Sequence, residues 1–117
     1  MNSPPHLSPA MVAGDLLFLS GQLAFGPEGR IEGDISVQTR RCLERLENVL
    51  REHGLDRSAI VKVSVWLTDC SAFTVFNDAY AAFFGEQRPA RSTVISGLAI
   101  DGALVEIDAV ALLQAAS

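Results

Sequence analysis

The segment Ile60-Val61-Lys62-Val63-Ser64-Val65-Trp66-Leu67 indicates the architecture of this chain more strongly than any other. Apolar and polar side chains alternate along it, which predicts a β-strand because successive side chains point to opposite faces of a sheet. The alternation predicts a buried face made of Val61, Val63, Val65 and Leu67. Trp66 falls on the other face, so we expect that face to meet apolar surface as well.

A predicted helix precedes this strand. Asp34 or Ser36 can cap its beginning, and it runs to about His53, before Gly54. Its apolar side chains recur at helical spacing, and charged side chains occupy the remaining positions, as in a helix with one solvated side. The apolar stripe consists of Leu43, Leu46, Val49 and Leu50.

A second predicted helix follows the strand. Asp69 or Ser71 can cap it, and Gly85 and Pro89 end it. Aromatic side chains at helical spacing are typical of a helix face packed on a core. The members of this stripe are Phe73, Phe76, Tyr80, Phe83 and Phe84.

The outer segments complete an α+β pattern. Residues 16–20, 91–97 and 103–112 are predicted strands, and residues 1–9, with three prolines, are expected to form a loose arm. The order of elements predicts a mixed sheet with two helices packed on one face. The opposite face would stay open, and its apolar members, together with Glu106 and Asp108, would favour association of subunits.

Size and composition narrow the class of protein. The 117 residues, 49% of them hydrophobic, predict a single globular domain spanning 1–117. A net charge of −5 with scattered basic residues argues against nucleic-acid binding. Cys42 and Cys70 lie in separate elements, and neither they nor the histidines show metal-site spacing. Without a signal peptide or a long apolar run, the chain is expected to be cytoplasmic and outside the membrane.

An arginine and a glutamate near the C-terminus indicate a candidate catalytic or binding site. Arg91 opens one predicted strand, and Glu106 lies in another between Val105 and Ile107. A carboxylate among apolar neighbours is costly to bury unless something pairs with it. A fixed cation beside it could hold a substrate carboxylate and a water molecule. A structural ion pair would give the same pattern, and Asp108 is a rival partner for Arg91.

Four motifs carry a resemblance to a known family. They are Ser20-Gly21-Gln22, Asn77-Asp78-Ala79-Tyr80-Ala81-Ala82-Phe83-Phe84, Pro89-Ala90-Arg91-Ser92 and Val105-Glu106-Ile107-Asp108-Ala109-Val110-Ala111. In this order and spacing the chain resembles the YjgF/RidA family of reactive-intermediate deaminases, from about Ser8 to Leu113. The resemblance implies a fold like trimeric chorismate mutase. It also implies a homotrimer with an inner barrel of sheets, outer helices and sites between subunits.

The resemblance also implies an activity and its residues. Members hydrolyse small 2-imino acids or their enamine tautomers to 2-keto acids and ammonia, without metal or organic cofactor. By position, Arg91 matches the arginine that grips the substrate carboxylate, and Glu106 the acid that positions water. The substrate-binding positions implied in the same way are Ser20, Gly21, Asn77 and Thr93.

One departure from the family pattern affects the activity. Leu7 stands where most deaminating members have a tyrosine in the N-terminal arm, and His6 is the one neighbour that could replace its hydrogen bond. The alternatives therefore stay open. They are a non-catalytic trimer that binds small carboxylates or acts as a chaperone, and the endoribonuclease or translation inhibitor that some members are labelled.

Overall fold

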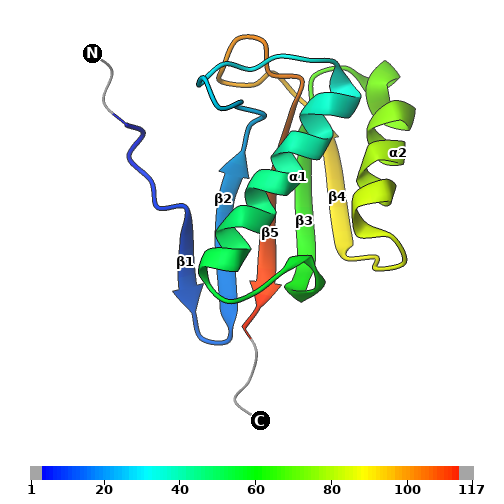
Figure 1. The fold of residues 1–117 in the computed structure, drawn as a ribbon. Helices are drawn as coiled ribbons and strands as arrows, with labels where there is room; N and C mark the ends of the chain where they lie inside the picture. The colour runs from blue at the N-terminus through cyan, green and yellow to red at the C-terminus, as the bar shows by residue number, and fades with distance from the viewer. Residues whose placement is uncertain (1–3, 114–117) are drawn as a thin grey trace.

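The computed structural model describes residues 4–113 and places five strands and two helices in them (Figure 1). The strands are β1 (Ala10–Ala13), β2 (Leu16–Gln22), β3 (Ile60–Leu67), β4 (Ala90–Ile95) and β5 (Val105–Leu112). The helices are α1 (Ile35–Glu52) and α2 (Phe73–Phe84), and single 3₁₀ turns cover Arg57–Ala59 and Cys70–Ala72. The predicted α+β class is confirmed.

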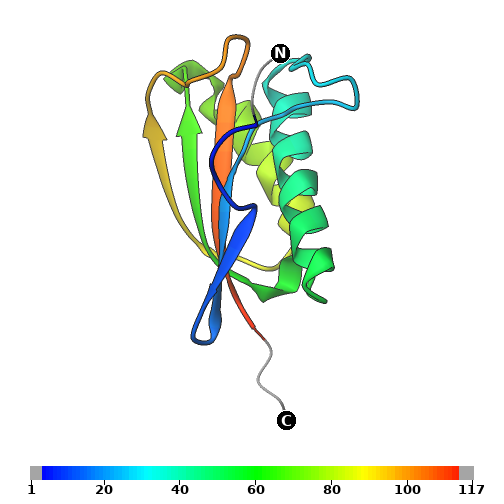
Figure 2. The same cartoon turned by 90° about the vertical axis from the view of Figure 1, so that its left-hand side faces the viewer.

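One mixed sheet organises the domain. Its strand order is β1-β2-β5-β3-β4, and every neighbouring pair is antiparallel except β3 and β4. These two parallel strands are joined through α2, as a parallel pair requires a crossover. Figure 2 shows both helices on one face of the sheet and no helix on the other, as the sequence predicts.

The core lies between the helices and the covered face of the sheet. Leu43, Leu46 and Leu50 of α1 are fully buried, together with Phe76 of α2. The strands contribute Leu17, Val63, Val65, Leu67, Val105 and Ile107, all at most 1% exposed. Asp34 caps α1 by accepting a hydrogen bond from the backbone N–H of Val37, whereas Ser36 lies inside the helix.

The structure corrects two details of the predicted core. Val61 is 43% exposed and Ile60 is buried in its place, because the β3–β5 register shifts between Ile60 and Lys62. Phe73 was expected in the aromatic stripe but is 42% exposed, since Asp69 caps the 3₁₀ turn before α2 and Phe73 only begins the helix.

The N-terminal segment is more ordered than a loose arm. The sequence did not single out β1, which pairs with β2 from Ala10 opposite Leu19 onward. Two residues ahead of β1 accept hydrogen bonds from Ser20 of β2. The Ser20 backbone N–H donates to the carbonyl of Pro9 at 2.9 Å, and the Ser20 hydroxyl donates to the carbonyl of Ser8 at 2.6 Å. These bonds tie the end of the arm to β2.

The uncovered face of the sheet combines apolar and acidic side chains. Phe18 lies opposite Val110, and Trp66 lies in register with both Val94 and Glu106, so these residues share one face. Phe18 and Val94 are 46% and 47% exposed. Single exposed apolar residues are ordinary, but a sheet face that carries several is typical of an association surface.

Candidate functional site

Glu106 projects from the uncovered side of β5. Its neighbours Val105 and Ile107 are fully buried on the helix side, so strand alternation directs Glu106 the other way. The side chain is half-buried, and no hydrogen bond or ion pair to it is found within residues 4–113. A half-buried carboxylate with no partner is costly, and such groups concentrate at functional sites.

Gly21 leaves open the space that the Glu106 carboxylate occupies. The β2–β5 register shifts between Leu19 and Gln22, and this irregularity sets Gly21 beside Glu106. A Cβ atom built on Gly21 would overlap Glu106 Oε2 and would lie 3.0 Å from its carboxyl carbon. The absence of a side chain at Gly21 is therefore what lets the carboxylate rest against the β2 backbone.

The surroundings hold the pKa of Glu106 above its usual range. Desolvation is the larger cause, and the charge of Asp108 is the smaller one. Burial also raises the pKa of Asp108, while the neighbouring Ser64 and the charge of Lys62 oppose this. No positive charge is among the causes that act on the pKa of Glu106, whereas Lys62 opposes the shift at Asp108.

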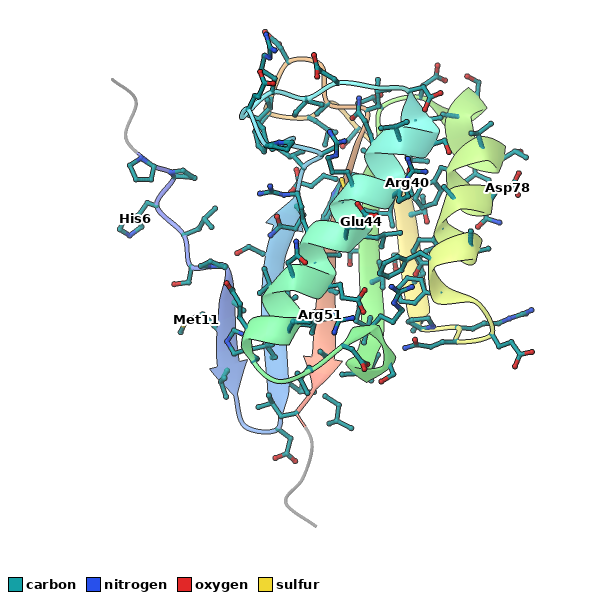
Figure 3. The ribbon with its side chains drawn as sticks, viewed as in Figure 1. His6, Met11, Arg40, Glu44, Arg51 and Asp78 are labelled. Atoms are coloured by element: carbon teal, nitrogen blue, oxygen red, sulfur yellow. The ribbon has the colours of Figure 1, made fainter. Side chains whose placement is uncertain are left out.

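A pocket of about 770 Å³ opens beside Glu106. The arm forms one wall of it with Leu7, and α1 forms another with Val49. The remaining lining is Pro5, Pro9, Gly21, Gln22, Leu23, Phe25, Arg45, Asn48, Glu52, Ala99, Ile100 and Glu106. We call this the Glu106 pocket. His6 is exposed and does not line it, and Figure 3 shows His6 on the arm, well away from the helices.

Arg91 lies in a different place. It pairs in register with Val63, whose side chain is buried on the helix side, so Arg91 points toward α2. Its guanidinium carbon lies 4.6 Å from the ring centre of Tyr80, 5.4 Å from Phe76 and 5.7 Å from Phe73. Aromatic faces attract a cation at these distances, so the three rings hold the guanidinium at the sheet edge.

A second pocket, of about 540 Å³, surrounds Arg91 and is lined by Asn77 and Tyr80 among others. We call it the Arg91 pocket. Thr93 pairs in register with Val65 and therefore faces the same side as Arg91, further along β4. The Tyr80 hydroxyl is buried and makes no hydrogen bond to any described residue. Burial raises its pKa, and the charge of Arg91 opposes that shift.

The expected pairing of Arg91 with a carboxylate is wrong within one chain. Arg91 on β4 and Glu106 on β5 project from opposite faces of the sheet, and β3 lies between them. Asp108 projects from the same face of the sheet as Glu106, so the sheet separates it from Arg91 as well. Across the part of the chain that the structure describes, none of the ion pairs involves Arg91. The chain thus carries two separate candidate half-sites, one around Arg91 and one around Glu106.

The other predicted site residues divide between the two halves. Gly21 lines the Glu106 pocket and Asn77 lines the Arg91 pocket. Ser20 and Thr93 line neither pocket: Ser20 precedes Gly21 on β2, and Thr93 faces the same side of the sheet as Arg91. The Ser20 hydroxyl is already engaged with the carbonyl of Ser8, so its described role is to anchor the arm. Sequence reasoning missed the apolar lining of the Glu106 pocket, because its members come from the arm, two loops and α1.

Three further findings concern metal ligands, the buried cysteine and the helices of the described residues. Nowhere in 4–113 do three His, Cys, Asp or Glu side chains gather in a way that could hold a metal ion. Burial raises the pKa of Cys42 to about 12, and its thiol lies 3.7 Å from the Val105 carbonyl, so it is a core side chain. Neither described helix is long and apolar enough to cross a membrane.

Comparisons with known proteins agree with the fold. The sequence profile of the family described as Endoribonuclease L-PSP matches residues 2–113. A RutC family protein of Pyrococcus horikoshii is 40% identical over 94% of this chain and 91% of its own length. A Rid family protein of Yersinia pestis has a TM-score of 0.86 at 36% identity, covering 95% of this chain and 90% of that one. E. coli TdcF, solved with bound serine, has a TM-score of 0.88 at 29% identity, covering 96% and 91%.

Proposed function

Because this chain belongs to the YjgF/RidA family, we propose that it deaminates small reactive 2-imino acids, or their enamine tautomers, by hydrolysis to 2-keto acids and ammonia. The observation that carries the proposal is Glu106, a half-buried carboxylate with a raised pKa and no described partner, at the edge of a pocket. Such a group can act as a general base near neutral pH.

The two half-sites meet in a homotrimer in this proposal. A ring of identical subunits joins two different surfaces of the chain at each interface, so the Arg91 side of one copy can face the Glu106 side of the next. The uncovered sheet face, with Phe18 and Val94 exposed, would be buried toward the inside of the ring. This arrangement explains how residues on opposite faces of one sheet can serve one reaction.

Arg91 binds the substrate carboxylate. A guanidinium donates two parallel N–H bonds to a carboxylate, which fixes both the position and the plane of the bound group. Phe76 and Tyr80 keep the guanidinium in place. Asn77 lies in the same pocket and can orient the ligand. Among the described strands β4 pairs with β3 alone, so peptide groups near Thr93 face outward on its other side. The serine bound by the E. coli relative is a carboxylate ligand of suitable size.

Glu106 activates the water. As the water oxygen bonds to the imine carbon, Glu106 accepts a proton from it. Starting from the protonated imine, that proton passes to the amino nitrogen of the tetrahedral intermediate. The C–N bond then breaks and ammonia leaves. The hydroxyl oxygen gives its remaining proton to Glu106, which passes it to ammonia or solvent, and the C=O bond of the 2-keto acid forms. General-base assistance of this kind contributes about 10²–10⁴-fold in rate. Gly21 and the arm anchored by Ser20 keep the carboxylate and the pocket wall in position.

The test is a coupled assay in which an amino-acid oxidase generates 2-iminopropionate and semicarbazide traps what remains. Wild type should speed the loss of the imine, and Arg91→Ala and Glu106→Gln should not. Arg40→Ala is the control, because Arg40 is an exposed arginine of α1 that lines neither pocket (Figure 3). No acceleration by wild type would overturn the proposal.

Mixed trimers test whether the site is shared. Arg91→Ala and Glu106→Gln subunits, unfolded together and refolded at equal amounts, should regain about a quarter of wild-type activity, because a random junction joins the two intact side chains in one case of four. A site contained in one chain would give no recovery.

A second candidate is a non-catalytic trimer that binds small carboxylates. Leu7 favours it, because this side chain lines the Glu106 pocket without offering a hydroxyl. Stabilisation of the protein by 2-keto acids, with no imine hydrolysis, would support it.

Cleavage of RNA that is lost in Arg91→Ala would support the nuclease activity after which the family is described. A cytoplasmic location remains our expectation.

A further inference from the structure

The Glu106 pocket is far larger than the reacting groups of a small imino acid require. In a single chain it is a pocket of about 770 Å³ that is open to solvent, whereas a closed apolar cavity of about 150 Å³ already accepts a benzene ring. We propose that this pocket receives the substrate's own side chain, and that the preferred substrates are 2-imino acids with a large branched or aromatic side chain. The inference rests on the proposed function and adds a substrate class to it.

The lining supports an apolar occupant. Leu7, Leu23, Phe25, Val49 and Ile100 provide the walls, and Glu106 lies among the same lining residues. Leu7 and Ile100 are 59% and 41% exposed, so they have apolar surface left to bury against a ligand. Burying such surface is favourable in proportion to its area.

The polar residues around the pocket do not offer an alternative binding site for a charged ligand. Arg45 donates to the side-chain oxygen of Gln22 at 3.0 Å and to the carbonyl of Phe25 at 3.5 Å, so its guanidinium already has partners. Asn48 and Glu52 are exposed residues of α1 at the rim. Glu106 is the half-buried carboxylate of the lining, whereas Glu52 is exposed, so Glu106 fixes which end of the ligand reacts.

The walls are held in place before any ligand binds. Two hydrogen bonds from Ser20 tie the arm to β2, and a β-bridge between Phe25 and Ile31 closes the loop after β2. Val49 is 9% exposed and packs in the core. A preformed pocket loses little conformational entropy on binding, so apolar contacts appear directly in selectivity.

The experiment compares kcat/KM for imines generated in situ from alanine, leucine and phenylalanine. The leucine and phenylalanine imines should exceed the alanine imine by about tenfold or more, the factor that a few additional buried carbons give in an apolar pocket. Ile100→Trp, which fills the pocket, should bring this ratio toward one. Val75→Trp is the matched control, because Val75 is 48% exposed on α2 and lines neither pocket.

Leu7→Glu is the second variant, in case Ile100→Trp does not fold. Leu7 is exposed on the arm, so the substitution places a charge in the pocket wall without disturbing the core, and it should also lower the ratio. Equal or lower kcat/KM for the bulky imines, with the alanine imine still hydrolysed, would overturn the inference and leave the proposed function intact.

If wild type hydrolyses none of the imines, the proposed function fails and binding decides the inference. Phenylpyruvate should then raise the melting temperature more than pyruvate does, and Ile100→Trp should remove the difference. Equal shifts with the two keto acids would overturn the pocket assignment.

Discussion

Two glutamates, Glu47 and Glu106, show how differently this small domain treats the same side chain. Glu47 is buried on α1 and accepts bonds from Arg57 at 3.1 Å and 2.6 Å, along with the Arg57 backbone N–H at 3.0 Å. The hydrogen bond from the Arg57 side chain is the main reason that its pKa lies below the usual range. Glu106 has no such partner among residues 4–113, and burial raises its pKa.

Under the proposed function, the difference separates a structural carboxylate from a reactive one. Arg57 also donates to the carbonyl of Phe83 and stacks 3.8 Å from the Phe83 ring, so the Glu47 cluster joins α1, the 3₁₀ turn and α2. Every charge in that cluster is satisfied. At Glu106 the chain leaves a charge unsatisfied, which lowers stability but keeps a basic oxygen available.

The largest expected effect is on turnover. Glu106→Gln should lower imine hydrolysis by about 10²–10⁴-fold, because the amide cannot accept a proton from water. Glu47→Gln should leave turnover per folded protein unchanged. Measuring kcat for both variants sharpens the comparison, and equal losses would show that Glu106 is no more catalytic than Glu47.

Gly21→Ala should lower turnover by about tenfold or more while leaving the protein folded, because the new methyl displaces the Glu106 carboxylate. Gly97→Ala is the control. Gly97 has open space around its Cβ position and no positive φ, so activity should not change. Steady-state kinetics and circular dichroism decide the outcome, and full activity in Gly21→Ala would contradict the placement of Glu106.

Glu47→Gln should lower the free energy of unfolding by about 2 kcal/mol at pH 7, the usual cost of losing hydrogen bonds to a charged group. Since the folded pKa of Glu47 is depressed, its stabilisation is present above the unfolded pKa of roughly 4.3 and disappears as pH falls through the folded value. Urea titrations at pH 7 and pH 3 measure this, with the exposed Glu44→Gln as control. A loss equal at both pH values would contradict the ion-pair account.

The smallest expected effect is a slight gain in stability, opposite in sign to the loss expected for Glu47→Gln. The folded pKa of Glu106 is raised, so its ionisation costs stability once pH rises above roughly 4.3, the unfolded value. Glu106→Gln should therefore raise the melting temperature slightly at pH 7 and hardly at all at pH 4. A lower melting temperature at pH 7 would mean that Glu106 has a stabilising partner after all.

Alternation and helical spacing were sufficient to predict the helices, the principal strands and which face of β5 carries Glu106. They could not reveal the shift that exposes Val61, because a bulge depends on how two strands pair. They also could not show that Arg91 and Glu106 lie on opposite faces. That relation depends on β3 lying between their strands and on the parallel β3–β4 register, neither of which is local.

The position of β4 at the edge of the sheet has a consequence for motion. Arg91 sits on a strand held by one neighbour, whereas β5, which carries Glu106, is held by two. Strands with fewer ladder bonds open at lower free energy, so amide hydrogens of β4 should exchange with solvent faster than those of β5. If Arg91 binds the substrate as proposed, local opening of β4 would move Arg91 away while Glu106 stays in place. The fraction of molecules able to bind a carboxylate would then depend on how often β4 is closed.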